Sequence, residues 1–241
     1  MPIHRDLNHN FFKKWSSEMA YVLGFFAADG SMICNKRGAH FIEFTITDRI
    51  VLEMIQKTVG SSHKIQKRNQ SNDKWKSQYR LQIGSKQWFI DLSRLGFTQN
   101  KSNILQFPKV PNKYLGDFVR GYFDGDGCVY SKCLHYADRK NPRLVLLTLF
   151  TSGCRLFLEL LWHKLRTRGI IGGSLKKKTR GFELVFSHND SIALHRLMYH
   201  TDKVPELYLP RKRHKLENAI RELQMRSYGN YHTPRKFGEY N

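Results

Sequence analysis

The chain has 241 residues, of which 40% are hydrophobic and 13% aromatic, so it can bury a sizeable core and is not a disordered basic tail. Its 41 lysines and arginines stand against 20 acidic residues, and the resulting charge of +21 favours a polyanionic partner. No apolar run has transmembrane length and no signal peptide is recognisable, so we expect an intracellular protein with no membrane partner.

The cysteines give no sign of a zinc site. Cys34, Cys128, Cys133 and Cys154 are scattered, and none forms a Cys-x-x-Cys pair. Scattered cysteines are typical of a reducing compartment.

The first half of the chain predicts an apolar helix that ends at Asp29, a hairpin, a helix, a second hairpin and a final helix. The polar stretch 31–38 separates the first two strands, and Thr47 or Asp48 can cap the second helix. The apolar face expected for that helix consists of Ile50, Val51, Met54, Ile55 and Val59. The second hairpin and the final helix are expected at 62–66, 78–83 and 87–95.

The second half repeats this order. After the apolar segment that ends at Asp126, the predicted strands and helices occupy 128–130, 144–150, 153–168, 173–178, 181–186 and 190–199. We therefore predict an α+β fold of two pseudo-symmetric αββαββα units, each with a four-stranded antiparallel sheet. The expected domains are a first unit at 15–105, a linker at 106–112 that contains two prolines, a second unit at 113–225 and a tail at 226–241, irregular from about Ser227.

Each predicted sheet should bury one face under helices and leave the other face free. Arg, Lys and Gln can read base edges in a major groove, which admits a two-stranded ribbon. A solvated polar sheet face is the alternative, but the charge of +21 favours contact with DNA. The candidate DNA-binding residues are Lys36, Arg37, Lys64, Gln66, Arg68, Gln78, Arg80, Gln82, Lys132, Arg139, Arg143, Lys176, Lys178 and Arg180.

Two nine-residue segments repeat each other. Residues 22–30 read VLGFFAADG and residues 119–127 read VRGYFDGDG, so each apolar segment ends in Asp-Gly. A carboxylate at a helix C-terminus faces the negative end of the macrodipole, which costs a few tenths to about 1 kcal/mol. The repetition of this cost at Asp29 and Asp126 suggests a divalent cation, whereas the alternative is that each Asp-Gly only ends its helix.

The small residues of both segments favour close packing. Gly24 and Gly121 carry no side chain, so we expect them to form the interface between the two helices. Side-by-side packing would bring Asp29 and Asp126 together with the neighbouring carbonyl groups of Ala28 and Gly125. These oxygens make a candidate site for Mg²⁺.

This pattern resembles the LAGLIDADG motif of homing endonucleases. The resemblance lies in the third-position glycines, the acids Asp29 and Asp126 and the final glycines Gly30 and Gly127, and it extends over residues 15–222. It implies a single-chain protein whose sheets form a saddle on DNA and whose motif helices pack together, with the two acids binding catalytic metal. Asp124 is not assigned to the catalytic pair, because its counterpart in the first motif is Ala27.

The resemblance also implies a basic catalytic residue near the metal in each half. Lys101 and Lys212 each follow the last predicted helix of a half, although either could be a solvent-exposed lysine. Lys212 lies farther from its motif than Lys101 does, so we expect insertions near 135–141 and 201–206. An ammonium there could stabilise developing charge or polarise water.

The expected function is that of a monomeric, site-specific homing endonuclease, without an obligate protein partner, that breaks both strands of a long non-palindromic DNA target. Mg²⁺ is the expected cofactor; Mn²⁺ should substitute for it and Ca²⁺ should bind without supporting cleavage. An RNA-binding intron maturase and a non-catalytic DNA-binding regulator are the alternatives on the same scaffold. The start Met-Pro offers no splicing nucleophile, so a free-standing or intron-encoded protein of an organelle, bacterium or phage is expected.

Overall fold

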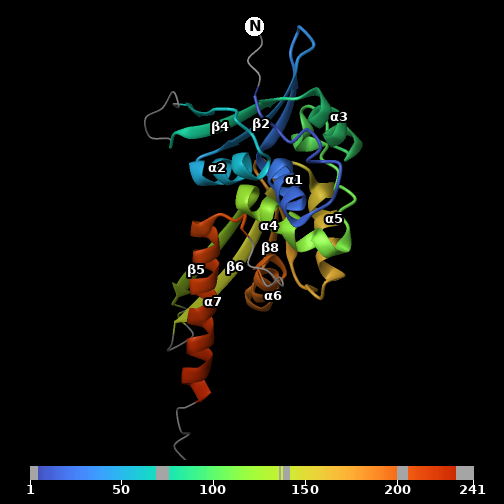
Figure 1. The fold of residues 1–241 in the computed structure, drawn as a ribbon. Helices are drawn as coiled ribbons and strands as arrows, with labels where there is room; N and C mark the ends of the chain where they lie inside the picture. The colour runs from blue at the N-terminus through green and yellow to red at the C-terminus, as the bar shows by residue number, and fades with distance from the viewer. Residues whose placement is uncertain (1–4, 69–75, 136, 138–141, 200–205, 232–241) are drawn as a thin grey trace, which may run out of the picture.

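The computed structural model describes residues 5–68, 76–135, 137, 142–199 and 206–231, and it contains two units of the same element order (Figure 1). The first unit consists of α1 (Ser17–Asp29), β1 (Gly30–Cys34), β2 (His40–Ile46), α2 (Arg49–Thr58), β3 (Ile65–Arg68), β4 (Gln78–Gly84) and α3 (Lys86–Arg94). The second consists of α4 (Leu115–Asp126), β5 (Gly127–Leu134), β6 (Arg143–Ser152), α5 (Arg155–Arg166), β7 (Ser174–Lys178), β8 (Gly181–Phe186) and α6 (His188–Tyr199). The predicted α+β class and repeated order are therefore confirmed.

Three further elements complete the chain. The short 3-10 helix η1 (Lys101–Asn103) follows the first unit, η2 (Asn112–Tyr114) precedes the second, and the long helix α7 (Pro210–Tyr231) follows the second. Residues 105–111, between the units, form neither helix nor strand.

Both sheets are antiparallel and have the same topology, with strand orders β1-β2-β4-β3 and β5-β6-β8-β7. The registers are equivalent as well: Gly30 pairs with Phe44 in the first sheet and Gly127 with Phe150 in the second. Alternate residues of each central strand are buried against helices, as Phe44 and Phe150 are, which leaves the other sheet face open.

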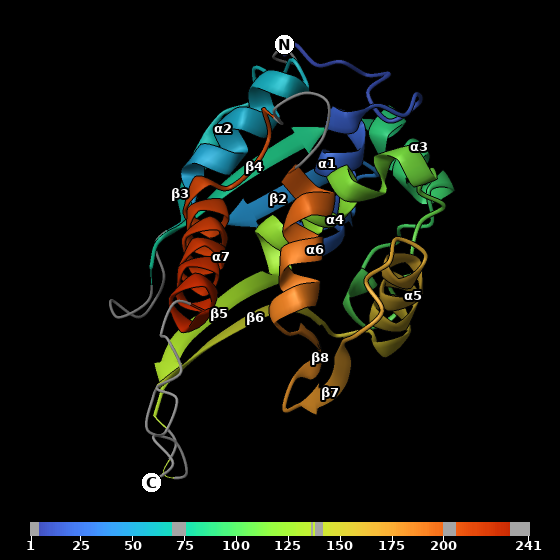
Figure 2. The same cartoon turned by 90° about the horizontal axis from the view of Figure 1, so that it is seen from below.

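The helices α1 and α4 pack against each other at the centre of the molecule (Figures 1 and 2). A Cβ atom on Gly24 would lie 2.0 Å from the carbonyl oxygen of Phe118, and one on Gly121 would lie 2.0 Å from that of Tyr21. Any side chain at either position would therefore collide with the backbone of the other helix, so glycine is what permits this approach.

Local sequence explains most helix boundaries. The Ser16 hydroxyl accepts a hydrogen bond from the Met19 amide and caps α1, and Ser85 caps α3 in the same way through Trp88. Gly96 follows α3 with a positive φ of 94°, which a residue without a Cβ adopts easily.

Three expectations are wrong. The polar stretch 31–38 does not separate the first two strands, because residues 31–34 belong to β1 and only residues 35–39 lie between β1 and β2. Ile50 is 47% exposed and does not belong to the apolar face of α2, where Leu52 is buried instead, because α2 begins at Arg49 and directs Arg49 and Ile50 outward while Val51 and Leu52 face the core. The chain does not become irregular at Ser227, since α7 continues to Tyr231; its residues 217–226 are mostly good helix formers, and the next proline is Pro234. Among the helices described, none is long and apolar enough to cross a membrane.

Candidate metal and nucleic-acid site

Asp29 and Asp126 are the last residues of the two central helices, and their carboxyl groups interact across the helix interface. The small Gly125 makes room for them: a Cβ there would lie 3.1 Å from Asp29 Oδ2 and 2.4 Å from the Ala28 Cβ. Burial and the neighbouring Asp126 raise the pKa of Asp29 to about 7, and burial raises the pKa of Asp126 as well. Two partly desolvated carboxylates so placed repel each other, which a cation between them would relieve.

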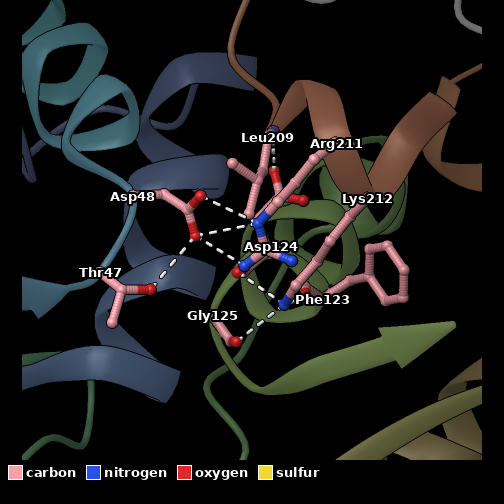
Figure 3. A network of polar contacts seen from close by, with 8 residues as sticks. All are labelled: Thr47, Asp48, Phe123, Asp124, Gly125, Leu209, Arg211 and Lys212. Atoms are coloured by element: carbon pink, nitrogen blue, oxygen red, sulfur yellow. Dashed lines mark hydrogen bonds and ion pairs between the residues drawn. The ribbon is translucent and has the colours of Figure 1, made fainter. Parts of the chain in front are cut away.

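Lys101 and Lys212 flank this pair and are not solvent lysines, since only 6% and 7% of their surface is exposed. Lys101 Nζ donates to the Ala27 carbonyl oxygen at 2.8 Å, at the C-terminus of α1. Lys212 Nζ donates to the carbonyl oxygens of Phe123, Asp124 and Gly125 at 2.8, 2.8 and 2.9 Å, at the C-terminus of α4 (Figure 3).

Each ammonium therefore caps the carbonyl end of a motif helix, where the macrodipole favours positive charge. Burial lowers the pKa of both lysines to about 8, although the acidic groups nearby act in the opposite direction. Each also lies over an aromatic ring: Lys101 Nζ is 5.7 Å from the centroid of Phe26, and Lys212 Nζ is 5.5 Å from that of Phe123.

The donor set fits a magnesium-type ion. Magnesium sites commonly use one or two carboxylates and leave the other positions to water and substrate phosphate. Asp29 and Asp126 supply two carboxylates, and no cluster of three His, Cys, Asp or Glu residues exists in the described part of the chain that could form a closed protein cage. The Gly125 carbonyl, expected as a ligand, already accepts from Lys212, whereas the Ala28 carbonyl lies one residue before Asp29.

An ion pair that joins the two halves holds the start of α7. Arg211 Nε lies 2.9 and 3.1 Å from the two carboxylate oxygens of Asp48, and Arg211 Nη2 lies 2.6 Å from Asp48 Oδ2 (Figure 3). Asp48 occupies the N-cap of α2 but makes no side-chain cap bond there, since its carboxylate faces Arg211. Hydrogen bonding to Arg211 lowers the pKa of Asp48. The sequence predicted only the capping position, because the partner comes from the other half of the chain.

Asp124, which the resemblance does not assign to the catalytic pair, also holds this turn. Its Oδ2 accepts hydrogen bonds from the Tyr21 hydroxyl at 2.8 Å and from the Leu209 amide at 2.7 Å. The side chain is fully buried, and burial raises its pKa to about 6. The signal available in the sequence was the unmatched acid itself, because the equivalent Ala27 cannot accept a hydrogen bond through its side chain.

The open face of the first sheet carries the predicted polar side chains. Lys64, Gln66 and Arg68 are exposed, whereas Gln78, Arg80 and Gln82 are half-buried on β4, and Lys36 and Arg37 lie in the exposed turn between β1 and β2. An acid that the prediction omitted lies among them. Glu43, 9% exposed, is 3.4 Å from Arg80 Nη1, accepts from Gln82 Nε2 at 3.2 Å and lies 3.9 Å from Arg68.

The second sheet carries its cations toward its edges. Lys132, Arg143, Lys176 and Lys178 are exposed on the strands and Arg180 in the β7–β8 turn, while Arg139 lies outside the described residues. Lys178 Nζ is 3.3 Å from Glu183. The two sheets thus present cations that the structure leaves accessible.

Comparison with known proteins identifies this architecture. A family model described as a LAGLIDADG-like domain matches residues 16–94. An uncharacterized protein of Methanocaldococcus jannaschii is 26% identical over 123 residues, which are 48% of this chain and 41% of that protein. The DNA-directed RNA polymerase subunit Rpo1C of the same organism is 26% identical over 184 residues, 76% of this chain but 19% of the subunit. The matches therefore span less than half the length of these curated relatives.

Solved structures share the fold over nearly the whole chain. The LAGLIDADG homing endonuclease I-SmaMI, bound to cleaved DNA, superposes with a TM-score of 0.62 at 16% identity and covers 92% of this chain and 93% of its own. The LAGLIDADG meganuclease I-AabMI, bound to uncleaved DNA, gives 0.59 at 15% identity and covers 87% and 91%. Another I-SmaMI structure, with uncleaved target, was obtained in the presence of calcium ions and gives 0.59.

Proposed function

Because residues 16–94 are a LAGLIDADG-like domain in a chain that has the fold of LAGLIDADG endonucleases over nearly its whole length, we propose that this protein is a metal-dependent, site-specific DNA endonuclease. The observation that carries the proposal is the pair of carboxylates, Asp29 and Asp126, with one buried lysine beside each motif helix. The proposed reaction is hydrolysis of one phosphodiester bond in each strand of a duplex.

The two carboxylates would hold Mg²⁺, which supplies a bound water of lowered pKa and a charge next to the scissile phosphates. Asp29 and Asp126 would hold the ion, and its charge would relieve their mutual repulsion. Lys101 and Lys212 add fixed positive charge at a site where charge develops in phosphoryl transfer. Their ammonium groups are already anchored on helix carbonyls, so they need no reorganisation during the reaction.

The partner in this proposal is duplex DNA, bound as a monomer across both open sheet faces. The charge of +21 supports phosphate neutralisation, and the polar first sheet supplies Arg80, Gln82 and Gln66 for base contacts. Since the halves differ in sequence, the two halves of the target need not be palindromic. The retained pair of acids favours an enzyme over a non-catalytic regulator of the same fold.

Selection from a DNA library tests the proposal. The protein is incubated with a randomised or genomic duplex library and Mg²⁺, and the ends that are produced are sequenced. We expect one recurrent site cut in both strands, and no cut ends with the double variant Asp29→Asn/Asp126→Asn or with EDTA. Scattered cleavage without a recurrent site, or cleavage by the double variant, would contradict the proposal.

Binding to the selected site should weaken steeply with salt, because each neutralised phosphate releases counterions. Titration of the duplex at several salt concentrations measures this slope. A flat salt response would contradict binding across the basic sheets, and preferred binding to structured intron RNA over the selected duplex would favour a maturase.

A further inference from the structure

The open faces of the two sheets differ at one structurally equivalent row. Because the registers match, the row next to each motif helix is Ser31–Glu43–Gln82 in the first sheet. In the second sheet it is Cys128–Leu149–Val185. Hydrogen-bonding side chains in one half are thus replaced by apolar ones at the same place in the other.

The apolar row continues along β6 as a strip that we define as Val145, Leu147 and Leu149. All three are half-buried on the open face, whereas Leu144 and Leu146 are buried under helices. Tyr130, opposite Leu147, is 40% exposed. Isolated apolar side chains on a surface are ordinary, but a continuous strip along one strand marks a binding surface.

The neighbouring row does not distinguish the halves, because Ile33 pairs with Phe41 in the first sheet as Tyr130 pairs with Leu147 in the second. The difference is therefore concentrated at Leu149 and Val185, which stand where the first sheet has Glu43 and Gln82.

Charge identifies what the strip can bind. Exposed cations lie around it: Lys132 pairs with Val145 across β5 and β6, Arg143 precedes the strip, and Lys176 lies on the edge strand β7, where Lys178 is ion-paired with Glu183. An apolar centre inside a cationic rim complements a groove that has phosphates at its edges and methyl groups on its floor. In the major groove the only methyl group is the one at C5 of thymine, which aliphatic side chains contact.

We propose that Leu149, with Leu147, determines specificity by contacting thymine methyl groups, so that the second half-site is read through apolar contacts. The equivalent row of the first sheet offers the half-buried Gln82 for hydrogen bonds to bases, whereas Glu43 is buried against Arg80 and Gln82. This inference rests on the proposed function, because it needs duplex DNA on the open sheet faces. It predicts thymines at positions of the second half-site near the centre of the target.

Replacement of single thymines by deoxyuridine tests this, because it removes the methyl group and keeps base pairing. Dissociation constants are measured for the selected duplex, without divalent metal, with one substitution at a time in the second half-site. We expect at least one substitution to weaken binding about 4-fold, the size expected for one buried methyl group.

Variants assign the effect to the strip. In Leu149→Ala or Leu147→Ala, the thymine and uracil duplexes should bind equally at the sensitive position. Leu156→Ala is the matched control, because Leu156 is 53% exposed on α5 rather than on the sheet face, and it should keep the 4-fold difference.

Three outcomes would overturn the inference. The second half-site could tolerate every uracil, the uracil effect could persist in both strip variants, or the free protein could dimerise in sedimentation experiments and become monomeric with Leu147→Lys. Failure to bind or cut any duplex in the library selection would instead contradict the proposed function.

Discussion

The two halves of the molecule agree at the centre and differ at the periphery. Asp29 matches Asp126, and Lys101 and Lys212 each donate to carbonyls at the end of a motif helix. Even the rings beneath the ammonium groups, Phe26 and Phe123, are equivalent. In the proposed function a shared metal site would need both acids and would constrain the centre, whereas the sheets could diverge with the DNA sequence that each contacts.

The lysines differ in how they are held. Lys101 lies in the three-residue helix η1 and makes one carbonyl bond, whereas Lys212 lies in the first turn of α7 and makes three. Asp124 and the Asp48–Arg211 ion pair fix that turn, whereas the segment before Lys101 is held by Gln99, which accepts a hydrogen bond from the Cys34 amide at 3.1 Å. The two lysines therefore make the same kind of contact but are held in place by different interactions. A mutation can for this reason affect one half more than the other.

Removal of either motif acid should have the largest effect. Asp29→Asn or Asp126→Asn should lower double-strand cleavage on the order of 10³-fold or more, because metal charge stabilisation is worth several kcal/mol. DNA binding should change little. Plasmid cleavage and duplex titration measure the two effects. The control Glu18→Gln removes an acid from the other end of α1 and should cleave normally. A normal rate in either motif variant would contradict the shared site.

Removal of the lysines should have the next largest effect and should separate the halves. Lys101→Met and Lys212→Met should each lower kcat on the order of 10²-fold with little change in KM, as for the loss of a preorganised charge. Lys212→Met should also destabilise the fold more, since it leaves three carbonyl oxygens without their donor rather than one. Thermal unfolding and cleavage kinetics measure both.

The exposed Lys215, on the same helix α7, provides the matched control through Lys215→Met. Equal destabilisation by the two site variants would contradict the unequal support.

A Cβ at the helix interface should act on both halves alike. Gly24→Ala and Gly121→Ala should each lower the free energy of unfolding by about 1–3 kcal/mol or more, because the new atom meets backbone 2.0 Å away. Activity should fall further than stability, since both acids are displaced. Gly84→Ala is the control, because a Cβ there would be at an ordinary 3.6 Å from Phe41. Unchanged melting in both interface variants would contradict the packing.

Local sequence patterns were sufficient for most of the fold. Amphipathic periodicity, alternation and glycine stops predicted the repeated order of helices and strands, as with the helix predicted at 87–95 and found at Lys86–Arg94. They did not predict the long helix α7, and they placed residues 31–34 of β1 between strands. The duplicated Asp-Gly segments predicted the paired helices, because two similar segments in one chain indicate two equivalent helices that can pack against each other. The proximity of Lys101 and Lys212 to the helix ends followed from the resemblance, not from periodicity.

Long-range partners could not be predicted in the same way. Asp48 contacts Arg211 across 163 residues of sequence, and Asp124 contacts Tyr21 across 103. Each pairing depends on the packing of the two units, which local propensity does not encode. Glu43 was overlooked for a related reason: its role follows from register, which places it opposite Gln82.

The raised pKa of Asp29 should make the metal-free protein less stable as the pH rises. The pKa of this carboxyl group is about 7 in the folded protein and has an ordinary value of 3.8 in the unfolded chain. The free energy of unfolding therefore falls between these two pH values, and the loss is complete above pH 7. Asp29→Asn should therefore melt on the order of 5 °C higher than the unchanged protein at pH 8 and at the same temperature near pH 4. Calorimetry with EDTA measures both; a lower melting temperature at pH 8 would contradict it.

The smallest effect should come from the ion pair between the halves. Asp48→Asn should lower the free energy of unfolding by only about 0–1 kcal/mol, because the pair is partly solvent-exposed. The rate should nevertheless fall several-fold through kcat, since Arg211 precedes Lys212 and a displaced α7 start moves that ammonium. Because Asp48 has a lowered pKa, its contribution to the free energy of unfolding should be present above its ordinary value of 3.8 and disappear as the pH falls below it.

The double variant Asp48→Arg/Arg211→Asp should recover part of kcat, whereas Glu53→Gln, which removes the local pair with Arg49, should leave kcat unchanged. A loss of kcat that the reversed pair does not recover would mean that this ion pair does not position Lys212, and that the two halves position their lysines independently.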